Sequence, residues 1–263
     1  MKIGIICPVA HLQEFATRST FHLILPHLYE EFPAYKEFYT ERAKQGDFVV
    51  QDSSIFELEH SMPGEQLLEL AEEVGANEMV TPEVLLDAEA SKRKLTEFLE
   101  TYTKRGATVA LQSVVQGKTI EEMCRYWAYL LTIREVSTIG VPFDIDIPTD
   151  VTKGIQSKTL RRVLNRWHLM DLAERANLLK KPVHLMGLSD AVELQHYDHP
   201  MIRSNDSSSA FVHGAEMVYY QDRGLPCEKI SKKLDFGVTL LEQEQITAVH
   251  SNISRIQQFA RAL

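Results

Sequence analysis

The chain has 263 residues, of which 44% are hydrophobic, and this is enough for one large domain with a buried core. Its 28 basic and 37 acidic residues give a net charge of −9, which argues against unspecific coating of nucleic acid but not against a local basic patch. Three widely spaced cysteines with no Cys-x-x-Cys pair argue against a thiolate zinc site, and no apolar stretch approaches the ~18 residues of a membrane span. We expect an intracellular, cytoplasmic protein that needs no membrane, no metal and no cofactor.

Short apolar runs alternate with longer amphipathic stretches, which is the pattern of repeated strand–helix units. Strands are predicted at 3–9, Phe48–Gln51, 78–81, 108–115, 137–141, 182–186 and 201–204, with a weaker one at 234–238. Helices are predicted at Gly64–Val74, 88–104, Ile120–Thr132, 160–178 and 246–262. The aromatic-rich segment 14–44 is interpreted as one or two helices with a buried aromatic face, or as a substrate lid or partner surface.

Seven or eight such units in 263 residues favour a closed barrel over an open doubly wound sheet. A dinucleotide or P-loop fold has little support, because no Gly-x-Gly-x-x-Gly follows the first strand and the chain holds no Walker loop. No linker, repeat or low-complexity tract interrupts the chain. The predicted fold is an α/β protein, a (β/α)8 TIM-like barrel, with residues 1–263 as a single domain.

Three of the predicted strands end in polar side chains that can do chemistry. Asp206 follows 201–204, Asp52 follows Phe48–Gln51, and Gln116 follows 108–115. Strand C-termini converge on one face of a parallel α/β protein, and that face holds the active site. One carboxylate can attack a sugar anomeric carbon while a second moves protons. The alternative for the two aspartates is structural, as a helix N-cap and a turn acceptor.

Other groups at strand ends suit the recognition of a flat base. The amide of Gln116 can read a purine edge with a donor and an acceptor, although an ordinary polar strand end has the same pattern. Gly140 and Gly187 close two further strands, where glycine either lets a flat ligand approach the backbone or makes a tight turn.

One predicted helix is strongly basic on an otherwise acidic chain. Lys158, Arg162 and Arg166 are four residues apart and share a helical face, and Arg161 lies beside them. These four residues are the candidate footprint for a phosphate backbone, with an ordinary solvated helix surface as the alternative.

Short segments that contain these groups follow one another in a fixed order. They are Val50-Gln51-Asp52-Ser53-Ser54-Ile55-Phe56-Glu57, Val80-Thr81-Pro82-Glu83, Val114-Val115-Gln116-Gly117, Gly140-Val141-Pro142, His184-Leu185-Met186-Gly187-Leu188 and Asn205-Asp206-Ser207-Ser208-Ser209-Ala210. In sequence and order they resemble the motifs of the tRNA-guanine transglycosylase superfamily, a barrel family that exchanges guanine in nucleic acid for a 7-deazaguanine.

The resemblance implies a role for each matched residue. Asp206 falls at the nucleophilic aspartate and Asp52 at the general acid/base. Glu83 or Asp87 falls at the base-recognising aspartate. The other residues implied to bind the base are Ser53, Phe56, Gln116, Gly140, Pro142, Met186 and Gly187.

The chain also departs from the family pattern. Ser54-Ile55 replaces the glycine pair of the second family motif, which implies a reshaped base pocket, and the cysteine-rich zinc subdomain of the tRNA enzymes is absent. Short zinc-free relatives resemble phage-type or DNA-modifying transglycosylases, so DNA is favoured over tRNA as the substrate. The expected partners are nucleic acid, a 7-deazaguanine base and either a second copy of the chain or a partner subunit.

Two alternatives stay open from the sequence. One is an enzyme that hydrolyses or exchanges the base of a free nucleoside or nucleotide. The other is a non-catalytic binding subunit derived from the same barrel.

Overall fold

The structure is a computed structural model that describes residues 1–261. Eight parallel strands alternate with helices in the order of a (β/α)8 TIM-like barrel, which confirms the predicted fold. The strands form one sheet in the order β1-β8-β7-β6-β5-β4-β3-β2. Their bounds are β1 Lys2–Ile5, β2 Phe21–Ile24, β3 Phe48–Gln51, β4 Glu78–Val80, β5 Ala110–Val114, β6 Val136–Pro142, β7 Val183–Met186 and β8 Ile202–Ser207.

The α-helices connect and follow these strands. Their bounds are α1 Leu12–Phe15, α2 Leu28–Glu31, α3 Pro33–Lys44, α4 Ile55–Leu58, α5 Gly64–Val74, α6 Ala88–Arg105, α7 Ile120–Thr132, α8 Lys158–Arg175, α9 Ser209–Ala215 and α10 Gln243–Phe259. Four short 3-10 turns accompany them, at η1 Val9–His11, η2 Ala16–Arg18, η3 Asp150–Thr152 and η4 Ala191–His196. Among the described residues, no helix combines the length and the apolar character that crossing a bilayer requires.

The chain divides into two compact units. The first unit consists of Met1–His22, Pro142–Asp171 and the chain from His184 onward, and the second of Leu23–Val141 and Leu172–Val183.

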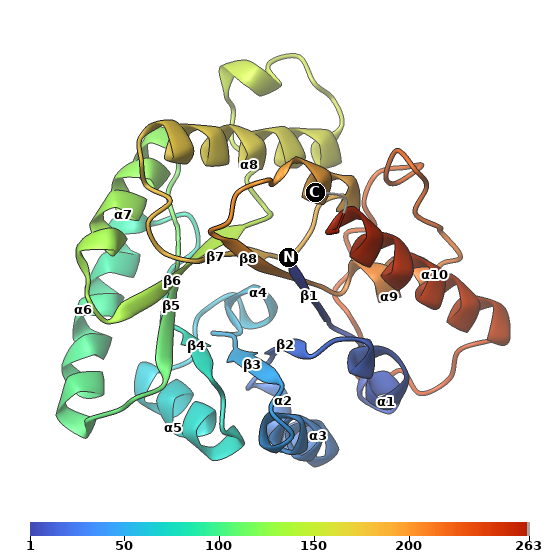
Figure 1. Cartoon of the computed structure of the whole chain (residues 1–263), viewed down its shortest axis with the longest axis horizontal. Coiled ribbons are helices and arrows are strands. Elements are labelled where there is room, and N and C mark those ends of the chain that lie inside the picture. The colour runs from blue at the N-terminus through green and yellow to red at the C-terminus, as the bar shows by residue number, and fades with distance from the viewer. Residues whose placement is uncertain (262–263) are drawn as a thin grey trace. The chain divides into compact units, whose positions relative to one another are not determined.

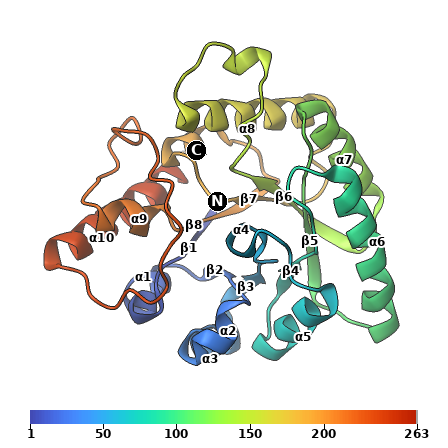
Figure 2. The same ribbon diagram turned by 180° about the vertical axis from the view of Figure 1, so that it is seen from behind.

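In the first unit, β1 pairs with β8 so that Gly4 lies opposite Asp206. Helix α10 packs along α9, and Figures 1 and 2 show the two side by side from opposite directions. The face that α10 turns inward is apolar, with Val249, Ile253 and Ile256 fully buried.

In the second unit, β3, β4, β5 and β6 are consecutive parallel neighbours. Helices α5, α6 and α7 lie along the outer side of these strands (Figure 1). Leu67 and Leu68 of α5 share a buried apolar cluster with Met79 of β4 and Leu111 of β5. This packing fixes the strand ends where the polar residues of the second unit begin.

Several sequence predictions need correction. The aromatic-rich segment 14–44 contains a whole strand, β2, besides its helices, because Phe21 to Ile24 are all buried and pair as a strand. Residues 234–238 form no strand, and Asp235 closes a turn there by accepting the N–H of Gly237. The last predicted helix begins three residues earlier than expected, at Gln243, and its predicted end at residue 262 lies outside the described residues.

Candidate functional site

Asp206 is buried near the end of β8, with 5% of its surface exposed. Its Oδ1 accepts two hydrogen bonds, one from His184 Nε2 at 2.9 Å and one from the backbone N–H of Gly187 at 3.1 Å. Both bonds involve Oδ1, and within the described residues neither involves Oδ2. Oδ1 therefore orients the carboxylate, and Oδ2 is available to react.

The hydrogen bonds around His184 fix its tautomer. Arg203 Nε can only donate, and it donates to Ser204 Oγ at 3.3 Å. The carboxylate of Asp206 can only accept, so His184 Nε2 carries a proton, and Nδ1 of the neutral ring accepts the hydroxyl proton of Ser204, 2.8 Å away. The chain of donors runs from Arg203 through Ser204 and His184 to Asp206, and it ends on a carboxylate that acts as acceptor.

Sequence reasoning gave His184 no role of its own, although the residue stands in a quoted segment. It is fully buried in β7, and Ser204 and Asp206 are two residues apart on β8, so their side chains point to the same face of the sheet. A histidine inside an apolar strand of a barrel was the available signal, since a fully buried imidazole needs partners for both nitrogens.

Gly187 follows β7 in a left-handed conformation, with φ +64°, which favours glycine. A Cβ there would lie 2.5 Å from Cδ1 of Phe143, so the ring of Phe143 also requires a glycine at this position. The fold thus explains Gly187 without a ligand, and the N–H of this residue is what reaches Asp206.

Arg166 is fully buried and holds the same turn. Its guanidinium donates to the carbonyls of Met186 at 3.0 Å and Gly187 at 3.1 Å, and Nε pairs with Glu193 at 3.0 Å. The prediction that Arg166 belongs to an exposed footprint is therefore wrong, because the donors of this side chain are used inside the protein.

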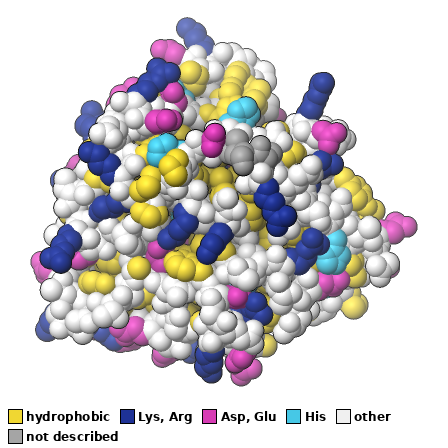
Figure 3. All heavy atoms as spheres, viewed as in Figure 1, with side chains coloured by type: hydrophobic (Ala, Val, Ile, Leu, Met, Phe, Trp, Pro, Cys, Tyr) yellow, Lys and Arg dark blue, Asp and Glu magenta, His cyan; other side chains and the backbone are white. Residues whose placement is uncertain are grey.

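The rest of the basic helix is mostly paired within the protein. Arg162 is 6% exposed and its Nη2 lies 2.5 Å from Asp144, while Arg161 binds both oxygens of Asp146. Lys158 has a 53% exposed side chain and lies 4.0 Å from the same Asp146 carboxylate. The α8 residues thus do not form a row of exposed cations. On the face drawn in Figure 3, Lys and Arg are interspersed with Asp and Glu.

The second unit holds a separate cluster of three predicted residues, Ser53, Glu83 and Gln116. Gln116 Nε2 donates to Glu83 Oε2 at 2.6 Å, and Ser53 Oγ donates to Glu83 Oε1 at 3.2 Å. The amide oxygen of Gln116 accepts the N–H of Leu86, which fixes the direction of the amide. Burial raises the pKa of Glu83 to about 7, although the bonds from Gln116 and Ser53 oppose the shift. Glu83 therefore gains or loses a proton readily near neutral pH.

The two candidates for the base-recognising acid have different surroundings. Glu83 is 3% exposed and joins this cluster. Asp87 accepts the N–H of Ala90 and caps α6, which is a sufficient structural reason for its carboxylate. The geometry favours Glu83 for the role.

Asp52 lies just past β3 and is buried, with 6% exposed. Its Oδ2 accepts the N–H of Ser54 at 3.0 Å, as in the turn that the sequence offered as the alternative. Ser54 has φ +58°, a conformation that costs a residue with a side chain, and its Oγ is 2.8 Å from His27 Nδ1. Ser54 thus has a backbone conformation typical of glycine. Phe56, two residues on, is 45% exposed.

The remaining predicted residues also sit at strand ends. Pro142 and Met186 are the last residues of β6 and β7. At Gly140 a Cβ would lie 2.8 Å from Val114 Cγ2, so packing against β5 is enough to explain the glycine.

Within residues 1–261, no group of three or more His, Cys, Asp or Glu side chains gathers as a metal site would require. The ring of His196 packs against Trp167 at a tilted angle, and His199 accepts the N–H of Met201, so both have structural partners. In comparisons with known proteins, no family model and no curated sequence matches this chain.

Proposed function

We propose that the protein is a base-exchange transglycosylase that replaces guanine in nucleic acid, DNA in preference to tRNA, by a 7-deazaguanine. The observation that carries the proposal is the carboxylate of Asp206, which is held through one oxygen by His184 and Gly187 while the second oxygen takes no part in the fold. An oriented carboxylate with one oxygen available, at the end of a barrel strand, suits nucleophilic attack on a sugar.

The reaction proceeds in two displacements at the sugar C1′. In the first, Asp206 Oδ2 forms a bond to C1′ and the bond from C1′ to the guanine nitrogen breaks, with its electron pair leaving on the base. Asp52 supplies a proton to that base and takes one from the incoming 7-deazaguanine. In the second displacement the new base attacks C1′ and the carboxylate of Asp206 is released, so the original anomer returns.

Glu83 and Gln116 suit the recognition of a guanine-like edge. Such an edge presents both donors and acceptors, and a carboxyl group with a pKa of about 7 can offer either. The Nε2 of Gln116 already donates to this carboxyl, so a base that binds Glu83 has to share or replace that bond. The target base leaves its stack before it binds, which favours loops, single strands or flipped nucleotides.

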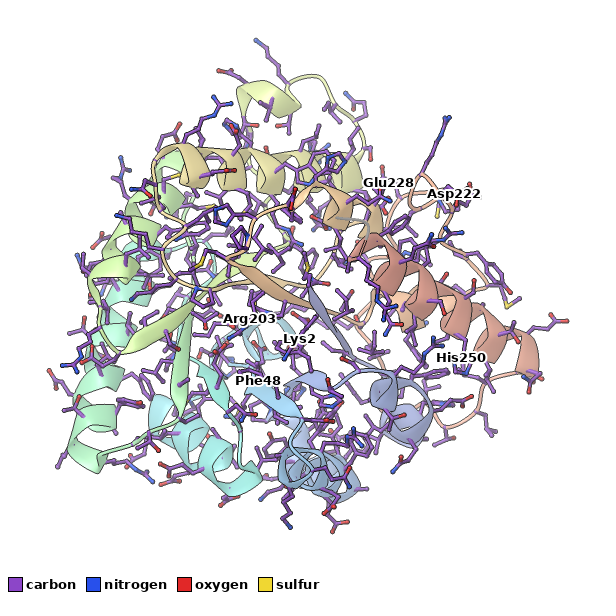
Figure 4. The ribbon with its side chains drawn as sticks, in the orientation of Figure 1. Lys2, Phe48, Arg203, Asp222, Glu228 and His250 are labelled. Atoms are coloured by element: carbon purple, nitrogen blue, oxygen red, sulfur yellow. The ribbon has the colours of Figure 1, made fainter. Side chains whose placement is uncertain are left out.

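The test is the release of labelled guanine from single-stranded DNA, and separately from tRNA, in the presence of a 7-deazaguanine. We expect release from DNA by the unaltered protein, and a protein–DNA adduct that survives denaturation when the second base is omitted. Asp206→Asn abolishes both. Asp222→Asn serves as the matched control, because the Asp222 side chain is 88% exposed on a loop (Figure 4), and it keeps full activity.

Two outcomes contradict the proposal. If the Asp206→Asn variant releases guanine at the full rate, Asp206 is not the nucleophile. Release from free guanosine but from neither polymer assigns the chain to small-molecule nucleosides instead.

A further inference from the structure

Lys229 lies on the long connection between α9 and α10, and hydrogen bonds hold the backbone at this position. Its N–H donates to Thr159 Oγ1 at 2.8 Å, and the next N–H, from Ile230, donates to His213 Nε2 at 3.2 Å. The neighbouring Glu228, labelled in Figure 4 near α8, accepts both the N–H and the hydroxyl of Thr159. The connection is thus tied to α8 and to α9 at the position of this lysine.

The half-buried side chain of Lys229 turns toward the turn after β7. Its ammonium donates to the carbonyl of Leu188 and lies 3.8 Å from the centre of the Phe143 ring. The guanidinium of Arg162 lies 5.7 Å from the centre of the same ring. Arg162 is 6% exposed, and its Nε has no hydrogen-bond partner among the described residues. A buried N–H without a partner is rare and calls for an explanation.

The charges around Lys229 leave one positive charge unmatched. Arg162 pairs with Asp144 and Arg166 with Glu193, whereas no carboxylate of the described chain pairs with Lys229. Burial lowers the pKa of Lys229 to about 7, and the arginines of α8 lower it further, while Glu193 and Asp144 act in the opposite direction. A bound anion would supply a counter-charge to the protonated ammonium.

We propose that Lys229 and Arg162 form a subsite for a phosphate group. An ammonium and a guanidinium are charged donors that phosphate oxygens accept strongly, and here both lie over the ring of Phe143. This ring packs against Gly187. The N–H of Gly187 in turn donates to Asp206. The subsite thus belongs to the surroundings of the candidate nucleophile. The assignment of the phosphate to a nucleic-acid strand rests on the proposed function; the subsite itself does not.

The first experiment uses inorganic phosphate and follows the Lys229 side chain by NMR, with its signal assigned from Lys229→Met. Phosphate shifts the signal and raises the pKa of Lys229 by about one unit or more, because the ligand favours the charged form. Sulfate, whose charge does not change between pH 6 and 8, binds more weakly as the pH rises through that range, because the ammonium loses its proton. If phosphate does not shift the Lys229 signal at pH 6, the subsite is overturned, and the role of Lys229 is to hold the loop in place.

The second experiment measures binding of a single-stranded oligodeoxynucleotide and needs no catalysis. Lys229→Met lowers the affinity about tenfold at pH 6, which is the loss expected for one charge-assisted hydrogen bond, and Lys229→Arg restores most of it. Lys232→Met is the control, because this side chain lies on the same connection between α9 and α10 and is 63% exposed. The Lys229→Met effect disappears when the contacted phosphate is replaced by a neutral methylphosphonate.

The outcomes separate the two proposals. Binding of inorganic phosphate without any effect of Lys229→Met on the oligonucleotide keeps the subsite and assigns it to free phosphate or a nucleotide, which counts against the polymer substrate. A tenfold loss on the oligonucleotide supports the subsite even if no base exchange is detected. Equal affinity of all variants for both ligands overturns it.

Discussion

Replacing Arg166 by methionine tests how the fold supports Asp206. Arg166 is fully buried, and methionine keeps much of its apolar stem while removing the guanidinium that holds Met186, Gly187 and Glu193. Loss of one partner from a buried pair leaves the other charge without compensation, at a cost of about 3–5 kcal/mol in unfolding free energy. For a chain of this length, the melting temperature falls by on the order of 10 °C.

Urea unfolding followed by circular dichroism measures the change. The double variant Arg166→Met with Glu193→Gln recovers at least about 1 kcal/mol of the loss, because it removes the stranded carboxylate. Lys158→Met, on the same helix but exposed, stays within about 0.5 kcal/mol of the unaltered protein. If Arg166→Met lowers the unfolding free energy by less than about 1 kcal/mol, the buried network is refuted, and Arg166 is exposed as the sequence predicted.

Three further predictions concern the other polar residues. His184→Phe removes a donor to Asp206 and lowers kcat by roughly 10- to 100-fold with little change in KM, whereas His184→Gln, which keeps a donor, recovers part of it; equal rates for the two variants contradict the positioning role. The raised pKa of Glu83 stabilises the fold below the unfolded pKa of about 4.3, and this contribution of roughly 3 kcal/mol is lost as the pH rises toward about 7. In Glu83→Gln the unfolding free energy therefore declines less between about pH 4.5 and about pH 7. An unchanged slope of unfolding free energy against pH counts against the raised pKa. Ser54→Ala loses the bond to His27 but keeps the left-handed backbone, so it is about 1 kcal/mol less stable than Ser54→Gly in thermal unfolding; the reverse order contradicts a strained turn.

The sequence is informative where the backbone pattern is simple. Strand β3 and helices α5 and α7 have their predicted bounds, because apolar periodicity and capping residues mark them clearly. Strand β2 escaped prediction because its four residues lie inside a run of aromatic side chains that also contains helices. Short buried strands and buried helices have the same apolar composition, so local pattern does not separate them.

The predicted site residues illustrate a second limit. Asp52, Glu83 and Gln116 follow strands as predicted, because the order of strands determines where their ends fall, whereas Asp206 lies within β8, which runs on to Ser207. Their partners depend on packing between elements distant in the chain, as with Arg166 and Glu193, which are 27 residues apart. The spacing of Lys158, Arg162 and Arg166 gives their angular positions on the helix but not which side of the helix is covered, and the covered side here includes the charged Arg166.

The turn after β7 has a consequence for the electronic state of Asp206. The carbonyl of Met186 and the N–H of Gly187 belong to a single peptide group, with Arg166 donating to its oxygen and Asp206 accepting from its nitrogen. A cation at the oxygen draws electron density along the conjugated bond and makes the N–H a stronger donor, an effect of about 10–30% of the strength of one such bond. The peptide group thus transmits the effect of the positive charge of Arg166 to Asp206, although the two side chains do not touch. Because Arg166 is fully buried, dissolved salt screens this effect little.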